Sequence, residues 1–331
     1  MKNKVFPKLL KRGSHIRVIS PSRSMAILSS ETINLATSRL EAAGYQVSFG
    51  KYAFENDEFF SSSIEHRLSD LHAAFSDNSV DAVLTAIGGY NAIQLLRGID
   101  YELIENNPKI LCGFSDITVL SNAIFAKTGL VTYSGPHFSS WGMKSGFKYT
   151  EKKFNDTLVI GGDHIVKNSS EWSDDAWYLN QADRNFMKND GAVVVNKGVA
   201  TGTIIGGHAR CLAALQGTNY WPSLNDSILF LEEDEETNLA LFDRLIESIT
   251  LQPGFEGVRG IVIGRFQTNS SVNLPDLIKM LKSKEILETI PIIINVNFGH
   301  TTPVMTFGIG AECSIQTTGK VINIKMKGHS S

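Results

Sequence analysis

The sequence of 331 residues has few cysteines, no long apolar run and no large excess of charge of one sign. Its three cysteines, Cys112, Cys211 and Cys313, are far apart and show no metal-ligand spacing, which argues against a disulfide framework and a cysteine metal motif. No stretch is long and apolar enough to cross a bilayer. The net charge of −3 gives no reason to expect a nucleic acid or a membrane surface as a partner.

The first twelve residues also lack the apolar core of a signal peptide, so we expect a cytoplasmic protein. Hydrophobic residues make up 42% and charged residues 20% of the chain, as in ordinary globular proteins. A chain of this length favours two domains that share a cleft. Gly88-Gly89 belongs to no complete dinucleotide-binding or phosphate-binding pattern, so no cofactor and no metal are expected.

The first half of the chain alternates predicted strands and helices. The predicted strands span 16–20, 45–49, 81–87 and 110–114. Ser29 or Ser30 is a candidate cap for a helix that ends at Gly44, and Ser62 with Glu65 has the spacing of a capping box. This rhythm predicts a mostly parallel sheet with helices on both faces, whose active crevice lies at the carboxyl ends of the strands.

The pattern weakens over 139–191, a polar stretch that contains three of the four tryptophans. A second strand–helix series then follows, with strands at 228–232, 260–265 and 291–296 and helices at 239–250 and 274–284. We therefore predict an α/β fold with an N-terminal domain (1–165), a tryptophan-containing polar loop (166–191) and a smaller second α/β domain (192–331). The active site is expected at the interface of the two domains.

Three strand ends carry the residue types of serine acyl transfer. Ser115 follows the apolar run 110–112 and opens a helical pattern, as in the turn that exposes a nucleophilic serine above a sheet. Glu232 ends an apolar strand, and His300 follows another strand and a glycine turn. A nucleophile, a base and an orienting carboxylate are the parts of a triad, although each residue alone has a structural explanation such as a helix cap.

Glu232 also begins an acidic run that continues to Glu236. We interpret residues 233–236 as a solvated helix start. A metal site in this run is disfavoured because no histidine lies nearby in the sequence.

Five segments together resemble the LD-carboxypeptidase family of serine peptidases, which includes the microcin C self-immunity proteins. They are Gly88-Gly89-Tyr90, Gly113-Phe114-Ser115-Asp116, Gly206-Gly207, Leu229-Phe230-Leu231-Glu232-Glu233 and Asn297-Phe298-Gly299-His300. The resemblance implies Ser115 as nucleophile, His300 as general base and Glu232 as its orienting carboxylate. It also implies backbone N–H groups of Gly89 and Asp116 as oxyanion donors, and a homodimer.

Within this family, the segment from Glu171 to Trp177 and the length of the middle region resemble the self-immunity branch. The resemblance implies a small-molecule substrate, an aminoacyl- or peptidyl-nucleotide whose amide is cleaved. Tyr90, Trp172, Trp177 and His208 are the candidate substrate contacts, and at position 208 the family usually has asparagine. A tryptophan face suits stacking on a base, although both tryptophans could equally anchor a loop.

Other interpretations stay open at this point. The substrate could be a murein tetrapeptide that loses its terminal D-alanine, or the chain could bind nucleotides or muropeptides without catalysis. A metal-dependent hydrolase is a weaker third alternative. Arg210 and Arg265 are the candidate cations for a substrate carboxylate or phosphate, and His137 is a reserve candidate near the cleft.

Overall fold

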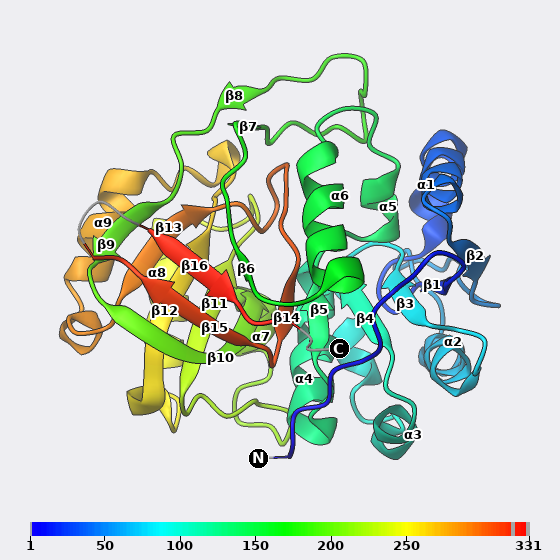
Figure 1. Ribbon diagram of the computed structural model, residues 1–331, viewed down its shortest axis with the longest axis horizontal. Coiled ribbons are helices and arrows are strands. Elements are labelled where there is room, and N and C mark those ends of the chain that lie inside the picture. Colours follow the sequence, from blue (N-terminus) through cyan, green and yellow to red (C-terminus); the bar gives the residue numbers. More distant parts are fainter. Residues whose placement is uncertain (1, 319–321, 329–331) are drawn as a thin grey trace.

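A computed structural model describes residues 2–318 and 322–328, and it has two α/β halves that each contain a large sheet (Figure 1). The first sheet has the strand order β14-β5-β4-β3-β1-β2, and its strands are parallel except for β14 against β5. These strands are β1 (His15–Ile19), β2 (Gln46–Phe49), β3 (Ala82–Thr85), β4 (Ile110–Gly113), β5 (Thr132–Ser134) and β14 (Phe307–Ile309). The mostly parallel first sheet is as predicted.

Helices pack beside this sheet. They are α1 (Ser30–Ala42), α2 (Ile64–Ser76), α3 (Tyr101–Asn106), α4 (Thr118–Thr128), α5 (Phe138–Trp141) and α6 (Lys148–Asn155). Ser29 caps α1 by accepting a hydrogen bond from the Thr32 N–H, and Gly44 follows the helix with a φ of +97°. The predicted cap of α2 is wrong by one residue, because Ser63 and not Ser62 accepts the bond from the His66 N–H.

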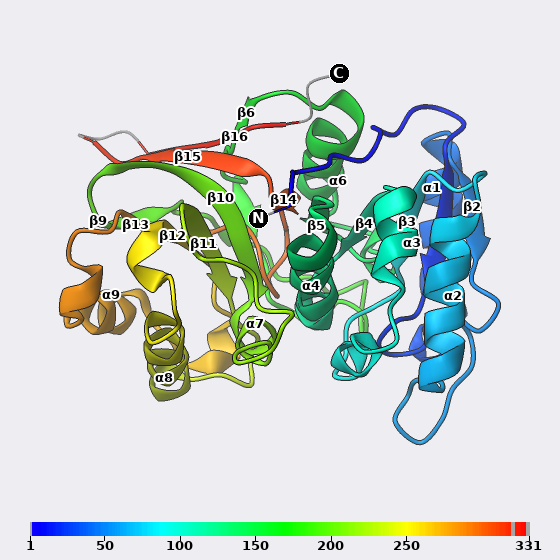
Figure 2. The ribbon, with the colours of Figure 1, turned by 90° about the horizontal axis from the view of Figure 1, so that it is seen from below.

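The second sheet has the order β6-β16-β15-β10-β11-β12-β13-β9, with a parallel centre from β10 to β13. Its strands are β6 (His164–Ile165), β9 (Val193–Asn196), β10 (Val199–His208), β11 (Ser227–Glu232), β12 (Val258–Gly264), β13 (Ile292–Val296), β15 (Glu312–Gln316) and β16 (Asn323–Met326). The helices α7 (Ala209–Ala213), α8 (Leu239–Thr250) and α9 (Leu274–Lys282) lie along one side of it in Figure 2. The second half is therefore also α/β, as predicted.

Helix α4 lies between the two halves, beside β4 and β5 on one side and β10 on the other (Figure 2). A Cβ added at Gly207 of β10 would lie 2.5 Å from Thr118 Oγ1, so glycine lets the strand approach the start of this helix. The buried Asn122 side chain donates to the Gly206 carbonyl at 2.8 Å and accepts from the Gly206 N–H at 3.2 Å. The helix that follows the candidate nucleophile is thereby fixed to a strand of the other half.

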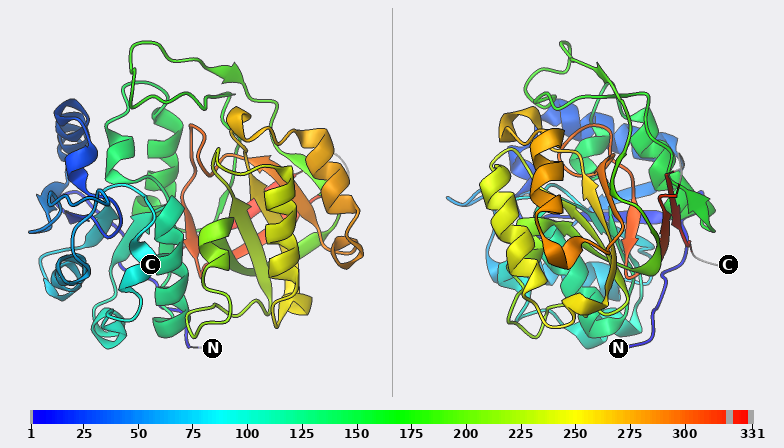
Figure 3. Two further views of the ribbon diagram at one scale, coloured as in Figure 1. Left: turned by 180° about the vertical axis from the view of Figure 1, so that it is seen from behind. Right: turned by 90° about the vertical axis from the view of Figure 1, so that its left-hand side faces the viewer.

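The polar stretch between the halves forms a small hairpin of β7 (Glu171–Trp172) and β8 (Met187–Lys188). This loop projects at one end of the molecule in front and back views (Figures 1 and 3). Further along the chain, β14 crosses back to pair with β5 of the first sheet. No helix in the described ranges combines the length and the apolar character that a membrane crossing requires.

Candidate functional site

Ser115 lies just after β4, at the start of a short 3-10 turn (Ser115–Ile117) that leads into α4. Its φ of +57° is unusual for a residue with a side chain, and such backbone strain is common at active sites. Gly88 faces it closely, because a Cβ at Gly88 would lie 2.9 Å from Ser115 Cβ and 3.0 Å from Oγ. The sharp turn and the facing glycine leave the hydroxyl room to point away from the strand.

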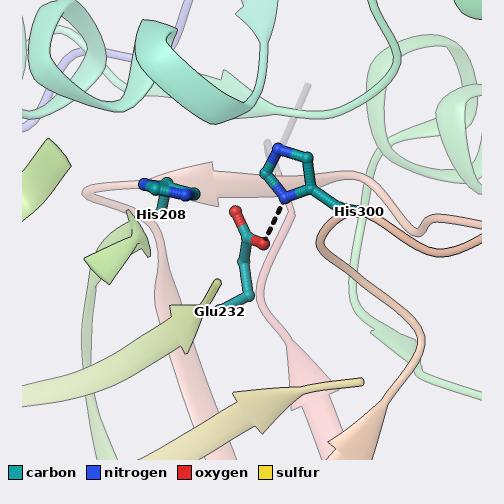
Figure 4. A group of neighbouring side chains, drawn as sticks. All are labelled: His208, Glu232 and His300. Carbon is teal, nitrogen blue, oxygen red and sulfur yellow. Dashed lines mark hydrogen bonds and ion pairs between the residues drawn. The ribbon is translucent and has the colours of Figure 1, made fainter. Parts of the chain in front are cut away.

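His300 joins Ser115 to Glu232 across the two halves of the molecule. Its Nε2 lies 3.0 Å from Ser115 Oγ, and its Nδ1 lies 2.8 Å from Glu232 Oε2. Figure 4 shows Glu232 reaching up from the end of its strand toward His300. The three residues that the sequence singled out as nucleophile, base and carboxylate are therefore within hydrogen-bonding distance in the order that acyl transfer requires.

The Glu232 carboxylate is buried, with 2% of the residue exposed. Burial raises the pKa of this carboxyl, but the charge of His300 and the hydrogen bond from it outweigh burial, so the pKa lies below its ordinary value. Gly299 makes room for this contact, since its φ is +106° and a Cβ there would lie 2.7 Å from Glu232 Oε2. The ionised carboxylate is thus placed to hold the imidazole in one orientation.

Asp116 directly follows Ser115, and Gly89 follows the Gly88 that faces it. Within the described residues the Gly89 N–H donates to no acceptor. Only the backbone of Asp116 was expected to contribute to the site, but its buried carboxylate also has a structural role. Asp116 Oδ2 accepts from Ser22 Oγ at 2.5 Å and from the Ala92 N–H at 2.9 Å. Asp116 therefore ties Ala92, which lies just after the glycine turn, and the loop at Ser22 to the turn of the candidate nucleophile.

His208 ends β10 directly beside Glu232 in the register of the sheet, and its ring centroid lies 5.3 Å from that of His300. Only 4% of the residue is exposed. Burial lowers the pKa of His208, but Asp234, the side chain of Cys211 and the charge of Glu232 outweigh burial and raise the pKa well above its ordinary value. His208 thus lies next to the proposed catalytic residues, as Figure 4 shows.

The acidic run after Glu232 differs from its interpretation as a solvated helix start. Glu233 is 1% exposed, and helix α8 begins only at Leu239. Arg210 Nη2 donates to Glu233 Oε2 at 2.8 Å and lies 3.4 Å from Asp234 Oδ1. The expectation failed because Arg210 and His208, which are distant in sequence, turn the first part of the run into a buried charge cluster.

Tyr90 is 67% exposed, and its hydroxyl donates to Glu236 Oε1 at 3.0 Å. This contact joins the glycine turn of the first half to the acidic run of the second. The guanidinium of Arg23 lies 6.0 Å from the centre of the Tyr90 ring. Tyr90 is therefore positioned at the junction of the two halves near the oxyanion candidates.

Trp172 and Trp177 both belong to the hairpin loop, but they differ in surroundings. Ser173, between them, exchanges two backbone hydrogen bonds of 2.7 Å with Thr302, two residues after His300. Trp172 stacks under the Arg265 guanidinium at 4.6 Å, whereas Trp177 packs against the core of the first half. The loop is thus attached to the turn that carries the candidate base.

Two further candidates occupy buried positions. Arg265 follows β12, is 6% exposed, and donates from Nη2 to Asn189 Oδ1 at 2.6 Å. Burial lowers the pKa of Arg265 to about 10. His137 lies beside the Phe114 ring, and its Nδ1 is 2.7 Å from Thr85 Oγ1, so it is not part of the Ser115–His300–Glu232 chain.

Family comparisons agree with this architecture. The model of the LD-carboxypeptidase N-terminal domain matches residues 16–135, and that of the C-terminal domain matches 201–315. "Putative carboxypeptidase YocD" of Bacillus subtilis is 48% identical over 98% of this chain and 100% of its own. "Microcin C7 self-immunity protein MccF" of Escherichia coli is 29% identical over 94% and 93% of the two chains. "Probable murein peptide carboxypeptidase" of Bacillus subtilis is 27% identical over 96% and 94%.

Solved structures show the same fold. An MccF-like protein from Bacillus anthracis superposes with a TM-score of 0.97 at 49% identity, covering 98% of this chain and 100% of that one. MccF in complex with aspartyl sulfamoyl adenosine gives a TM-score of 0.88 at 26% identity, covering 98% and 99%. The two domain models together span most of the chain, and the relatives match it almost end to end. The chain therefore belongs to the LD-carboxypeptidase family.

Proposed function

We propose that this protein is a serine carboxypeptidase or amidase that cleaves the amide of an aminoacyl- or peptidyl-nucleotide. The observation that carries the proposal is the hydrogen-bonded chain from Ser115 through His300 to Glu232. A serine this close to a histidine, with the other ring nitrogen held by a carboxylate, has the arrangement of an activated nucleophile.

In the first half-reaction, Ser115 Oγ attacks the substrate carbonyl carbon while His300 Nε2 takes the hydroxyl proton. The carbonyl oxygen becomes an oxyanion, for which the Gly89 and Asp116 backbone N–H groups are the proposed donors. The carbon–nitrogen bond then breaks, and His300 returns the proton to the leaving nitrogen. The acyl group remains on Ser115 as an ester.

In the second half-reaction, a water molecule attacks this ester and gives its proton to His300. The bond to Ser115 Oγ breaks, the serine recovers the proton, and the acid is released. Glu232 stays ionised throughout and stabilises the transient positive charge on His300. Its buried position and its 2.8 Å contact with Nδ1 support this role.

The nucleotide part of the substrate is inferred from the tryptophan loop and from relatives. MccF has been solved with aspartyl sulfamoyl adenosine and with glutamyl sulfamoyl guanosine. Here Trp172 and Trp177 flank Ser173, whose backbone is bonded to the Thr302 backbone beside the proposed base. We propose that one of these rings stacks on the base, and that His208 or Tyr90 contacts the acyl part. The predicted cytoplasmic homodimer and the domain limits also belong to this proposal.

The experiment is a direct comparison of two substrates. Purified protein is incubated with an aminoacyl sulfamoyl adenosine and, separately, with a murein tetrapeptide, and product release is followed by mass spectrometry. We expect release of the amino acid from the nucleoside compound. Loss of D-alanine from the tetrapeptide alone would replace the nucleotide proposal with the murein one, which the Bacillus subtilis murein relative makes the second candidate.

A serine-reactive fluorophosphonate separates an enzyme from a binding protein. We expect labelling at Ser115 and none in the Ser115→Ala variant. Absence of labelling, together with binding of either compound without turnover, would favour the non-catalytic interpretation. Activity that survives chelators is expected, because none of the proposed steps uses a metal ion.

A further inference from the structure

Three side chains next to the proposed catalytic residues, none of which takes part in the proposed proton transfers, converge on one point. His208 ends β10, and Glu233 and Asp234 follow β11. Their ligand atoms all lie within 4.8 Å of one another. We propose that His208, Glu233 and Asp234 form a binding site for one divalent transition-metal ion of the Zn²⁺ class.

The distances suit such an ion. His208 Nε2 lies 3.4 Å from Asp234 Oδ2 and 3.9 Å from Glu233 Oε2. Tetrahedral zinc holds nitrogen and oxygen ligands at about 2.0–2.2 Å, which puts neighbouring ligand atoms roughly 3.4 Å apart. The histidine and Asp234 already have this spacing, and Glu233 must move by only a few tenths of an ångström.

The buried histidine is the independent sign of a ligand. His208 is 4% exposed, and the nearest acceptor of Nε2 is Asp234 Oδ2 at 3.4 Å, an ion pair without the geometry of a good hydrogen bond. A buried polar atom without a hydrogen bond costs about 1–3 kcal/mol, and such atoms in native proteins call for an explanation. Nε2 faces the carboxylates of Glu233 and Asp234, and one metal ion placed between the three groups would bind an atom of each.

The local charge also favours a dication. Three carboxylates (Glu233, Asp234 and Glu236) share the single guanidinium of Arg210, and His208 faces the first two. Arg210 now contacts the same Glu233 oxygen that faces His208, so it competes with a metal ion for this position. Its side chain is 40% exposed, which leaves it room to turn toward solvent.

Ligand chemistry selects the metal class. One imidazole and two carboxylates suit zinc or cobalt better than magnesium or calcium, which prefer oxygen ligands alone. When Nε2 binds the ion, it releases its proton to solvent, and the remaining ring proton stays on Nδ1. Nδ1 now accepts from the Cys211 backbone nitrogen at 3.4 Å, and this contact is given up when Nδ1 carries the proton.

The ion would lie one residue from Glu232 and beside His300. Its positive charge there competes with His300 for the Glu232 carboxylate, so we infer that occupancy lowers turnover. The site shares His208 with the acyl contact proposed above, but binding of the ion is measured without substrate and without turnover.

The test is metal binding measured directly. The full-length protein is treated with EDTA, dialysed, and titrated with Co²⁺ while the visible d–d absorption is recorded, and with Zn²⁺ by calorimetry. We expect one ion per chain. His208→Asn and Asp234→Asn should weaken binding about tenfold or more, whereas His300→Asn should not weaken it.

Arg210→Gln provides the decisive complement, because it should tighten Zn²⁺ binding by about two- to fivefold when the competing guanidinium is removed. A simple loss of folding cannot produce that gain. The proposal is overturned if the unaltered protein takes up no stoichiometric ion. It is equally overturned if His300→Asn abolishes binding while Asp234→Asn does not, since the ion would then occupy the catalytic residues instead.

Discussion

At the scale of single residues, Ser115 is the position where a small change has the largest expected effect. Ser115→Ala should lower turnover by about 10³-fold or more while leaving the fold intact, because it removes the proposed nucleophile and no core packing. The measurement is the initial rate of amide cleavage, with the melting temperature as a check on folding.

Ser271 offers a matched control for this variant. It has the same φ of +57° as Ser115, but it lies in a surface turn after a 3-10 helix of the second half. Ser271→Ala therefore makes the same substitution at the same φ, but at a serine that has no proposed role in catalysis. Its rate of amide cleavage should equal that of the unaltered protein. Equal rates for the two variants would contradict the assignment of Ser115 as nucleophile.

His137 predicts how stability depends on pH. Burial, with smaller contributions from the charges of His300 and Arg23, lowers the pKa of His137 to about 3 from an ordinary 6.5. Between these pH values the unfolded chain binds a proton that the folded protein excludes. The contribution of His137 to the free energy of unfolding is therefore complete above pH 6.5. It declines as the pH falls toward 3, by up to about 1.4 kcal/mol per pH unit.

His137→Gln removes the imidazole that titrates, so the free energy of unfolding should decline less steeply with falling pH, by that amount. The measurement is the free energy of unfolding in urea at several pH values between 6.5 and 4. Parallel curves for the two proteins would show that His137 is protonated in the folded state as well.

The sequence was sufficient to predict the residues that lie at strand ends. Ser115, Glu232 and His300 each follow an apolar run. Parallel topology brings the ends of β11 and β13 to one edge of the second sheet, and Ser115 lies at the corresponding end of β4 in the first sheet. The same reasoning missed the side chain of Asp116 and the burial of Glu233. Their partners, Ser22 and Arg210, are distant in sequence, and no local pattern reports a contact of that kind.

At the scale of elements, the attachment of the hairpin loop is the feature to test. Arg265 holds Trp172 by stacking and Asn189 by a hydrogen bond, and Asn189 in turn donates to Asn297, just before the His300 turn. Arg265→Gln should speed amide exchange across 169–189 and raise KM more than it lowers kcat, because it loosens the loop and leaves the proposed nucleophile in place.

Arg259→Gln is the control for that change. Arg259 lies on β12, the strand that Arg265 follows, but its side chain is 56% exposed and pairs with Asp226 at the surface. Such exposed pairs contribute about 1 kcal/mol or less. Equal exchange rates in the two variants would contradict the anchoring role of Arg265.

Elements were predicted best where their apolar pattern is regular. Helix α8 was predicted correctly at 239–250 because it has an apolar face and an asparagine cap. Helix α6 was missed, since it has only eight residues, three of them lysines, and lies in the polar stretch. The predicted cap of α2 was one residue too early, because three consecutive serines, at 61–63, have the same hydroxyl group and only the folded backbone determines which of them caps the helix.

At the scale of the whole molecule, Asn122 connects the two halves. Asn122→Ala would leave both the N–H and the carbonyl of Gly206 without their buried partner, at a cost of about 1–3 kcal/mol. Since α4 also carries the turn of Ser115, we expect lower activity together with lower stability. Chemical denaturation and rates measured on the same samples would test this expectation.

Asn106→Ala, at the exposed end of α3, should change neither quantity. Unaltered activity in a clearly destabilised Asn122 variant would show that the packing of α4 does not control the site. That packing could not be predicted from the sequence, and neither could the return of β14 to the first sheet. Both depend on contacts between residues that are more than 80 positions apart.

The division of Ser115 from Glu232 and His300 between the two halves has a consequence for the life of the protein in a cell. The residues proposed for hydrolysis meet only when both halves are folded and joined along α4 and β10. A nascent chain that ends at the hairpin loop contains Ser115 but not the proposed base His300. The same is true of an N-terminal fragment that a protease has cut in that loop and that has separated from the second half. Such incomplete chains therefore lack the proposed activity toward amides, which arises only when the two halves have assembled.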